Sequence, residues 1–364
     1  MGRTFLPRAA TLSLPTLHPS LQWLALIVLA GCAGQLLAQL HIPAALFLGP
    51  MLVAIGFGVS GATIRMHKQA FRLGQGTVGV LVAHSMSMGV LVTALESWHV
   101  MLLGTVLTIV LSAVVGIGLV RYSGIPGNTA AWGTAPGAAS AMVAMAEDYG
   151  ADGRVVATMQ YVRVVCVVMV GAVVAKLIGA PGSGTVAHSV DLSLHGANMV
   201  NFGLSLAVIV GGVMIAARLP AGALLGPLFI GGALQLSGLL QITLPPWMLA
   251  LAYGCIGGYI GLRFDRATID YVWRRLPMMI IGSLVLILLC ALSAWVMAAM
   301  MGKDFLSVYL ATSPGGLDAM AIIAIDTHSD VGFVLAMQTL RLFGVIISGS
   351  YLARQIIRFA PKPA

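Results

Sequence analysis

Long apolar segments, separated by short polar ones, run through the whole chain. Stretches such as 101–120 and 278–301 contain no charged residue and are long enough to cross about 30 Å of hydrocarbon. Such segments recur six times in each half, and the pattern predicts an all-α polytopic membrane protein. We place them at residues 21–39, 43–60, 70–92, 98–120, 128–147 and 153–178, and then at 201–217, 220–238, 246–263, 276–300, 305–326 and 331–353.

The second half of the chain repeats the first at an offset of 177 or 178 residues. Thr-Ala-Pro-Gly-Ala-Ala-Ser-Ala-Met at 134–142 reappears as Thr-Ser-Pro-Gly-Gly-Leu-Asp-Ala-Met at 312–320. Eleven of the 28 positions from 136 to 163 are identical to their partners, where composition alone gives about two. We therefore interpret the chain as a duplicated unit. Each copy has Pro-Gly inside an apolar segment, which predicts a broken helix.

The placement of lysine and arginine predicts how the two halves are oriented, because cytoplasmic loops collect these residues. If all twelve segments cross, eleven Lys or Arg residues lie inside and six outside. If instead the Pro-Gly element of each half dips in and returns, fifteen lie inside and only Lys176 and Lys303 lie outside; the same parity follows if another element of each half fails to cross. The odd number of crossings then makes the halves inverted repeats, each with about five spans plus a Pro-Gly-broken element. The charges do not identify the element that fails to span.

This topology divides the chain into five parts. We expect both tails to be cytoplasmic, since both carry basic residues on the side that the loop charges assign to the cytoplasm. The parts are an N-terminal tail (1–20), a first membrane repeat (21–179), a linker rich in small and polar residues (180–200), a second membrane repeat (201–354) and a C-terminal tail (355–364).

Composition supports a membrane protein and argues against several other classes. Hydrophobic residues make up 59% of the chain and charged residues 8%, compared with about 25% charged residues in soluble domains. The net charge of +8 is scattered over loops and tails, so we expect no direct binding to nucleic acid. We find no phosphate-binding G-x-x-x-x-G-K-[ST] motif and no metal-type histidine spacing. We therefore expect no enzyme, no metal site and no cofactor.

The two Pro-Gly motifs are the strongest candidates for a functional site. Proline interrupts helical hydrogen bonding and glycine permits an unwound backbone. The helix that starts after such a break presents free N–H groups and a positive dipole end, which suits an anion. The other interpretation is a packing kink, which is common in membrane helices. The occurrence in both halves favours a site.

Polar residues follow each break at matching positions. Asp318 stands where the first half has Ser140, and a carboxylate beside a helix break can hold a proton or sodium ion or cap the helix. Gln-x-x-Arg follows in each half, and its arginine either braces the broken segment or contacts substrate. The complete candidate site comprises Thr134, Pro136, Gly137, Ser140, Gln160, Arg163, Ser313, Pro314, Gly315, Gly316, Asp318, Gln338 and Arg341.

Acidic residues also stand immediately before the last apolar segment of each half. Asp152 and Asp330 occupy the position that an N-cap takes, and we interpret them as structural caps.

The chain closely resembles the AbrB family of bacterial inner-membrane proteins over residues 20 to 362. Five runs carry the resemblance: Leu-His-Ile-Pro-Ala-Ala-Leu-Phe-Leu-Gly-Pro-Met (40–51), Arg-Tyr-Ser-Gly-Ile-Pro-Gly-Asn-Thr-Ala-Ala-Trp-Gly (121–133), Ala-Met-Val-Ala-Met-Ala-Glu-Asp-Tyr-Gly-Ala-Asp (141–152), Tyr-Leu-Ala-Thr-Ser-Pro-Gly-Gly-Leu-Asp (309–318) and Ala-Met-Gln-Thr-Leu-Arg-Leu-Phe (336–343).

The resemblance implies an internally duplicated protein of the inner membrane of Gram-negative bacteria that is linked to regulation of gene expression. Some members are labelled ammonia monooxygenase, but the chain has no copper-type histidine cluster. The duplicated, broken segments also look like the fold of sodium/proton antiporters and bile-acid symporters, a likeness that identifies no substrate.

These observations leave two functions open. The first is a secondary transporter in the lipid bilayer that carries a small organic anion, coupled to H⁺ or Na⁺, through a site between the two breaks. The second is a membrane-embedded regulator that acts on gene expression indirectly through its short basic loops. The sequence does not define the oligomeric state, and a homodimer remains an open arrangement.

Overall fold

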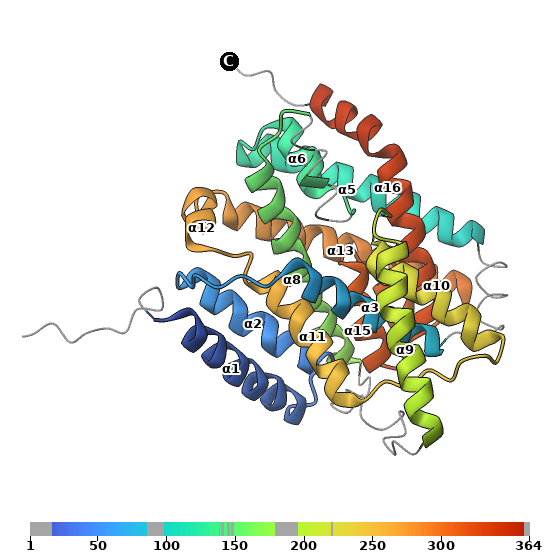
Figure 1. The fold of residues 1–364 in the computed structure, drawn as a ribbon. Coiled ribbons are helices and arrows are strands. Elements are labelled where there is room, and N and C mark those ends of the chain that lie inside the picture. Colours follow the sequence, from blue (N-terminus) through green and yellow to red (C-terminus); the bar gives the residue numbers. More distant parts are fainter. Residues whose placement is uncertain are drawn as a thin grey trace, which may run out of the picture.

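The computed structural model describes residues 17–85, 98–137, 139, 142–143, 146, 149–178, 196–219 and 221–359. These residues form fourteen helices and no strand. Figure 1 shows them as one helical assembly. The first-half helices are α1 (Pro19–Gln39), α2 (Ala45–Val59), α3 (Lys68–Ser85), α5 (Trp98–Ser123), α6 (Gly127–Thr134) and α8 (Gly153–Leu177). The second-half helices are α9 (Gly196–Ile215), α10 (Gly222–Leu236), α11 (Pro246–Gly261), α12 (Arg266–Val272), α13 (Leu276–Met301), α14 (Phe305–Thr312), α15 (Leu317–Asp326) and α16 (Val331–Phe359).

The all-α prediction is confirmed for the described residues, and every predicted apolar segment contains a helix. The segment 305–326 is divided into α14 and α15 at the Pro-Gly motif, as the sequence predicts. In the first half, α6 ends at Thr134, immediately before the corresponding motif. The short helix α12 was not predicted, because it has only seven residues and lies among charged residues between two apolar segments.

Several helices are long and apolar enough to cross a bilayer. Among the described residues these are α1, α5, α8 and α13. The pair α11 and α12, bent by 47° at a short break, would make a fifth. The sequence predicts about ten crossings, but helices such as α2 and α10 have only 15 residues and measure about 22 Å along their axes. Length and composition thus support a multi-pass membrane protein with fewer obvious spans than predicted.

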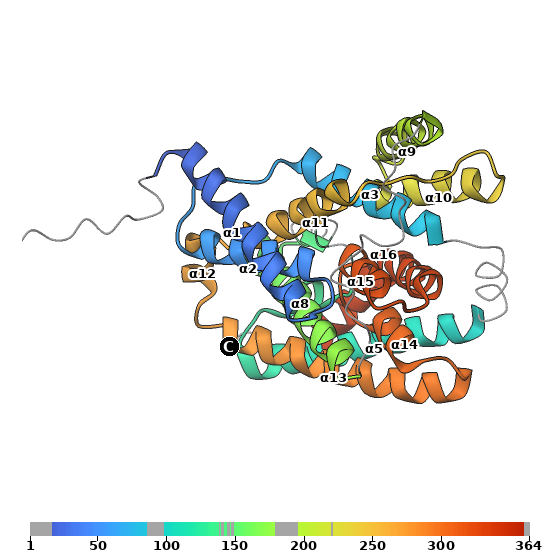
Figure 2. The same ribbon diagram turned by 90° about the horizontal axis from the view of Figure 1, so that it is seen from below.

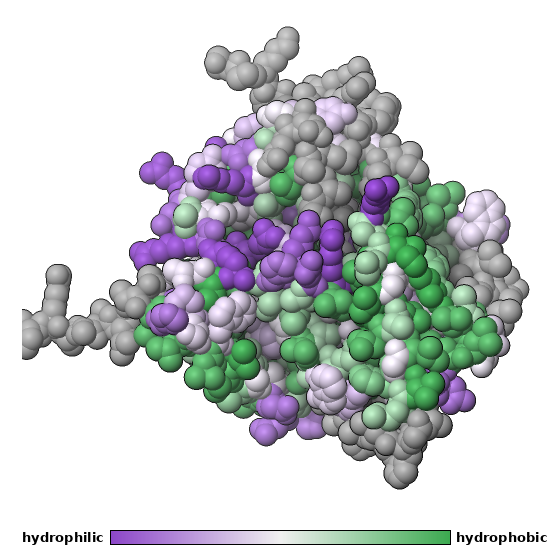
Figure 3. Space-filling view, in the orientation of Figure 1, coloured by the Kyte–Doolittle hydropathy of each residue, from purple (hydrophilic) through white to green (hydrophobic). Residues whose placement is uncertain are grey.

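The outward face of the long helices is apolar. On α13, Ile281, Leu288 and Trp295 recur every seven residues and have 52%, 59% and 67% of their surface exposed. In water this stripe would be unfavourable, whereas in a bilayer it faces hydrocarbon. Figure 3 shows the same property over α9 and α10, whose surface is hydrophobic. The surface therefore fits direct contact with lipid.

The helices divide into two bundles by their packing. In the first bundle, α2 packs on α1 and α11, and α10 packs on α3 and α9. The second bundle contains α5, α6, α8, α13, α14, α15 and α16, in which α13 lies against α5, α8 and α14. Figure 2 shows α3, α9 and α10 on one side of the molecule and α5 and α13 together on the other. The helix α3 joins the bundles through contacts with α15 and α16.

Glycines allow close helix crossings inside the first bundle. A Cβ on Gly79 of α3 would lie 2.3 Å from the Leu224 carbonyl oxygen on α10, and one on Gly257 of α11 would lie 2.6 Å from the Phe47 carbonyl oxygen on α2. Small residues at such crossings let helix backbones approach within van der Waals contact. The two crossings involve corresponding positions of the two halves.

Other details also match between the halves. The helices α2 and α10 have the same length and an internal proline at the same position, Pro50 and Pro227. Their N-caps, Ala44 and Ala221, both adopt left-handed backbone angles, with φ of 56° and 54°. The two halves therefore have the same local backbone structure at the start of α2 and of α10, their matching helices in the first bundle.

Candidate functional site

The backbone of the second Pro-Gly motif is not helical. The helix α14 ends at Thr312, and α15 starts again at Leu317 with Gly316 as its N-cap. Pro314 has no N–H to donate, so it cannot continue the helical hydrogen bonds of α14. The break leaves the last carbonyl groups of α14 and the first N–H groups of α15 without partners inside their own helices.

The Gln-x-x-Arg pair of α16 satisfies the carbonyl groups at the end of α14. Arg341 donates from Nη1 to the Ser313 carbonyl and from Nη2 to the Gly315 carbonyl at 3.0 Å. Gln338 donates from Nε2 to the carbonyl oxygens of Leu310 at 2.8 Å and Ser313 at 3.1 Å, and its Oε1 accepts from Arg341. A cation is favourable there, because a helix carries negative partial charge at its C-terminal end.

The pair on α8 does the same for α6. Arg163 donates from Nη1 to the carbonyl oxygens of Thr134 at 3.1 Å and Ala135 at 2.9 Å. Gln160 donates to the carbonyl oxygens of Trp132 at 2.8 Å and Ala135 at 3.0 Å, and accepts from Arg163 Nη2 at 2.7 Å. Of the partners that the sequence left open for these arginines, the carbonyl groups of the broken helix are the ones found.

The helices that carry these pairs begin at the two predicted N-caps. The Asp152 carboxylate accepts from the N–H groups of Arg154 at 3.0 Å and Val155 at 3.3 Å. The Asp330 carboxylate accepts from the Phe333 N–H at 3.0 Å. The interpretation of both aspartates as caps is therefore confirmed.

Asp318 lies in the first turn of α15, beside the break. Its carboxylate accepts a hydrogen bond from the Gln75 side chain of α3 at 2.8 Å. Asp318 forms no ion pair with any residue that the structure describes. The contact joins the two bundles, because Gln75 belongs to the first bundle and Asp318 to the second.

A cavity of about 530 Å³ lies between the bundles, at the two breaks. This volume is in the range of pockets that hold small ligands. The second bundle contributes both Pro-Gly segments, both Gln-x-x-Arg pairs and the first turn of α15, and the first bundle contributes parts of α3 and α11 and the start of α10. Nine predicted site residues line it: Pro136, Gly137, Gln160, Arg163, Gly315, Gly316, Asp318, Gln338 and Arg341.

Four predicted site residues are not part of this lining. Thr134, Ser313 and Pro314 are buried behind it, where the carbonyl groups of Thr134 and Ser313 accept from the arginines. Ser140 lies outside the described residues. The structure thus brings both Pro-Gly segments to one cavity, although they lie 178 residues apart in the chain.

The first bundle contributes polar residues to the cavity that were not predicted from the sequence. Lys68, Arg72 and Gln75 line the cavity from α3, and their spacing of four and three residues places them on one helix face. Arg218, before α10, also lines it. The spacing on α3 was a usable signal, but the partner of that face could not be known without the fold.

The C-terminal end of α15 forms a second contact between the bundles. The Asp326 carboxylate accepts a hydrogen bond from the Ala44 N–H at 2.7 Å, and the contact is buried. It satisfies the N-cap N–H of α2. The corresponding N-cap of α10, Ala221, instead lines the cavity. The two bundles therefore contact each other at both ends of α15, and the cavity lies at the Asp318 end.

A family model and a known relative place the chain in the same family. The model of the family described as "Transition state regulatory protein AbrB" matches residues 47–357. The "Putative regulator AbrB" of Escherichia coli (strain K12) is 42% identical over 345 residues, which cover 94% of this chain and 99% of that protein. The "Uncharacterized protein YhjN" of Bacillus subtilis (strain 168) is 27% identical over 297 residues, 77% of each chain. The chain belongs to the AbrB family.

Proposed function

We propose that this protein is a secondary transporter that carries a small organic anion through the cavity between its two bundles. One observation carries the proposal: two broken segments from opposite halves of the chain, with their Gln-x-x-Arg pairs and Asp318, line a single cavity of about 530 Å³. Broken helices that meet at a central cavity are typical of secondary transporters.

The charges around the cavity favour an anion. Lys68, Arg72 and Arg218 contribute positive charge from the first bundle, and basic groups that line a cavity raise the local concentration of anions. Deeper in the cavity, Gly316 and Leu317 expose the start of α15, where free N–H groups favour negative charge. A carboxylate group of the solute fits these positions.

The buried arginines can add to this site. Each guanidinium has five N–H donors, and three of those of Arg163 and of Arg341 are used in the bonds described above. The Nε of each arginine has no partner among the described residues. Their main role is to brace the broken helices, and a bound anion would gain from their charge.

Asp318 is the candidate for a coupling cation. It is a carboxylate in an otherwise cationic cavity, and its one described polar contact from another element is a neutral amide, Gln75. A proton or a sodium ion at Asp318 would remove repulsion between this carboxylate and an anionic solute. Uptake of anion and cation together follows from this arrangement.

In the proposed cycle each bundle moves as a rigid body. Each bundle contains helices from both halves of the chain, which we take to be inverted repeats. The side where Lys68, Arg72 and Arg218 line the cavity is the side that the loop charges assign to the cytoplasm. In this proposal the cavity opens to the cytoplasm, and the contact of Asp326 with Ala44 closes the far side. Rocking of one bundle against the other would exchange the open and sealed sides.

Uptake by proteoliposomes tests the proposal. Purified protein is reconstituted, and a panel of radiolabelled mono-, di- and tricarboxylates is offered under proton and sodium gradients. We expect uptake of at least one solute, with a loss of roughly tenfold or more in Asp318→Asn, which removes the charge and keeps the shape. Asp270→Asn is the matched control, because Asp270 lies on α12 with its side chain 73% exposed. Absence of flux for the whole panel contradicts transport, and equal flux in Asp318→Asn contradicts the coupling role of Asp318.

A second candidate is an indirect regulator of gene expression, as the printed names of the family and of the Escherichia coli relative suggest. One observation favours it: the two basic loops, 61–72 and 263–275, lie together, and Arg65 pairs with Asp265 at 3.6 Å. Figure 3 shows hydrophilic side chains gathered over the segment before α3 and over α12. This surface could bind a cytoplasmic partner.

A complementation experiment separates the two functions. A deletion strain receives the wild-type gene or the Asp318→Asn gene, and its transcripts are compared with those of the parent strain. If Asp318→Asn restores the transcripts but not the uptake, regulation is an activity of its own. If it restores neither, the change in transcripts follows from lost transport.

A further inference from the structure

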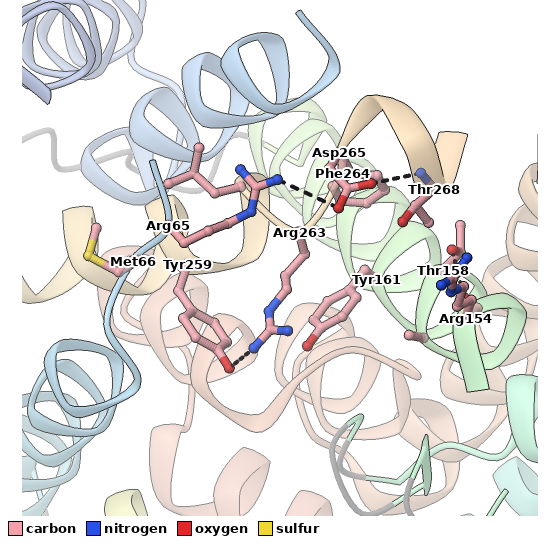
Figure 4. Close-up of a pocket in the computed structure, with 12 residues that line it drawn as sticks. Arg65, Met66, Arg154, Thr158, Tyr161, Tyr259, Arg263, Phe264, Asp265 and Thr268 are labelled. Atoms are coloured by element: carbon pink, nitrogen blue, oxygen red, sulfur yellow. Dashed lines mark hydrogen bonds and ion pairs between the residues drawn. The ribbon is translucent and has the colours of Figure 1, made fainter. Parts of the chain in front are cut away.

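A second, smaller cavity of about 300 Å³ lies beside the central one. Its walls come from α8, from the end of α11 and the residues that follow it, and from the segment before α3. Figure 4 shows Arg263 between the rings of Tyr259 and Tyr161, with Arg65, Asp265 and Thr268 beside them. We call this cavity the outer pocket.

The outer pocket carries an excess of positive charge. Arg65, Arg154 and Arg263 line it together with a single carboxylate, Asp265. Arg65 already has partners within the protein, because it pairs with Asp265 and donates to the carbonyl oxygens of Ala62 and Ile64 at 2.8 Å each. Two arginines therefore remain without a carboxylate partner among the described residues.

The two remaining arginines are held in place by aromatic rings. The Arg263 guanidinium lies 4.6 Å from the ring centroid of Tyr259 and 6.0 Å from that of Tyr161, and it donates to the Tyr259 hydroxyl. Arg154 lies 6.0 Å from the Tyr271 centroid. Contacts with a ring face orient a guanidinium without neutralising it. Their charges remain available to a ligand.

We propose that the outer pocket binds an oxyanion, a phosphate or carboxylate group, between Arg154 and Arg263. Guanidinium groups recognise such oxyanions through paired N–H donors. The pocket is separate from the central cavity but shares Tyr161 and Tyr259 with it. The site does not depend on transport: it also suits an anionic lipid headgroup at the membrane surface.

Calorimetric titration with inorganic phosphate tests this site. Full-length protein in a non-ionic detergent is titrated at constant ionic strength, with chloride replacing phosphate in the blank. We expect the phosphate affinity to fall roughly tenfold in Arg154→Gln and in Arg263→Gln, the loss of one charge-assisted hydrogen bond. Arg266→Gln is the matched control, because Arg266 begins α12 three residues after Arg263, and its side chain is 72% exposed and pairs with Asp270. We expect it to bind phosphate as the wild type does.

Two further arms identify where the anion sits and where it comes from. Arg218→Gln removes a charge from the central cavity: loss of phosphate binding in this variant alone would place the anion there and overturn the proposal. Phosphate binding that is absent, or equal in wild type, Arg154→Gln and Arg263→Gln, also overturns it.

In nanodiscs, competition between phosphatidylglycerol and phosphate supports the site with a lipid headgroup as the natural occupant. Undiminished phosphate binding there supports it with a free solute. Because phosphate binding needs no flux, a failed uptake experiment leaves this result unaffected.

Discussion

Arg163 and Arg341 show how a buried cation can be stable at a helix break when none of the described carboxylates pairs with it. Each donates hydrogen bonds to carbonyl groups at the end of a broken helix. Each also donates to the side chain of the glutamine three residues before it, which in turn donates to carbonyl groups of the same helix end. The sequence predicted the position of each arginine beside the break, and it left the partner open. The choice between carbonyl, carboxylate and bound anion depends on how α6 and α14 pack against α8 and α16, which no local pattern contains.

Replacement of Arg341 by lysine should destabilise the protein although the charge is kept. A single ammonium group cannot reach the carbonyl groups of Ser313 and Gly315 and the Gln338 side chain together. We expect a loss of about 2 kcal/mol in the free energy of unfolding, from buried groups left without partners. Thermal unfolding in detergent micelles measures it, with the exposed Arg266→Lys as control. An unchanged Arg341→Lys variant would show that the brace is dispensable.

The cap at Asp152 gives a pH-dependent prediction outside the membrane spans. Partial burial alone would raise its pKa, but hydrogen bonds from the Tyr271 hydroxyl and from the N–H groups of Val155 and Arg154 outweigh burial and hold the pKa of Asp152 below its ordinary value. A lowered folded-state pKa means that the stabilisation is present at neutral pH and is lost as the pH falls below about 4, through the folded-state pKa.

We therefore expect Asp152→Ala to lose about 1 kcal/mol of stability at pH 7, the usual effect of removing an N-cap. The difference from the wild type should shrink as the pH is lowered, because the wild-type carboxylate becomes protonated. Thermal unfolding at several pH values measures both effects. A difference that stays constant down to the lowest pH at which the wild type remains folded would mean that the charge of Asp152 does not contribute.

At the scale of elements, the Pro-Gly motif and the aspartate caps were predictable, because each acts on its own backbone within a few residues. The apolar segments were predictable for the same reason. The short helix α12, the face of α3 directed at the cavity and the division into two bundles were not. These features depend on contacts between distant segments, such as Gln75 with Asp318 and Gly79 with Leu224.

The glycine crossings predict unequal effects of the same substitution. Gly79→Ala and Gly257→Ala would each place a methyl group against a carbonyl oxygen of the facing helix, at 2.3 and 2.6 Å, so the helices must separate. We expect each to lower the stability by roughly 1–3 kcal/mol. Gly254→Ala on the same helix as Gly257 meets nothing within 4 Å and should be neutral or slightly stabilising. Equal melting temperatures for all three variants would contradict this close packing.

At the scale of the whole molecule, the central feature is a cavity between two bundles that contact each other at both ends of α15. Asp318 lies at the end that lines the cavity, and Asp326, eight residues further along, accepts from Ala44 at the other end. This arrangement resembles one state of a carrier that exposes its site to one face of the membrane at a time. The family model matches residues 47–357, which contain α3 to α15 and most of α2 and α16.

Accessibility of a thiol in the cavity tests this account most directly, because it needs no knowledge of the solute. Leu317→Cys, in the lining of the cavity, is introduced after replacement of Cys32, Cys166, Cys255 and Cys290. A membrane-impermeant maleimide is then applied to inside-out and to right-side-out vesicles. The control, Leu310→Cys, is fully buried in α14 and should react in neither.

We expect Leu317→Cys to react in inside-out vesicles, where the cytoplasmic face is exposed, and far more slowly in right-side-out vesicles. Reaction from neither face, or at equal rates from both, would contradict a cavity that is open to the cytoplasm and sealed on the other side.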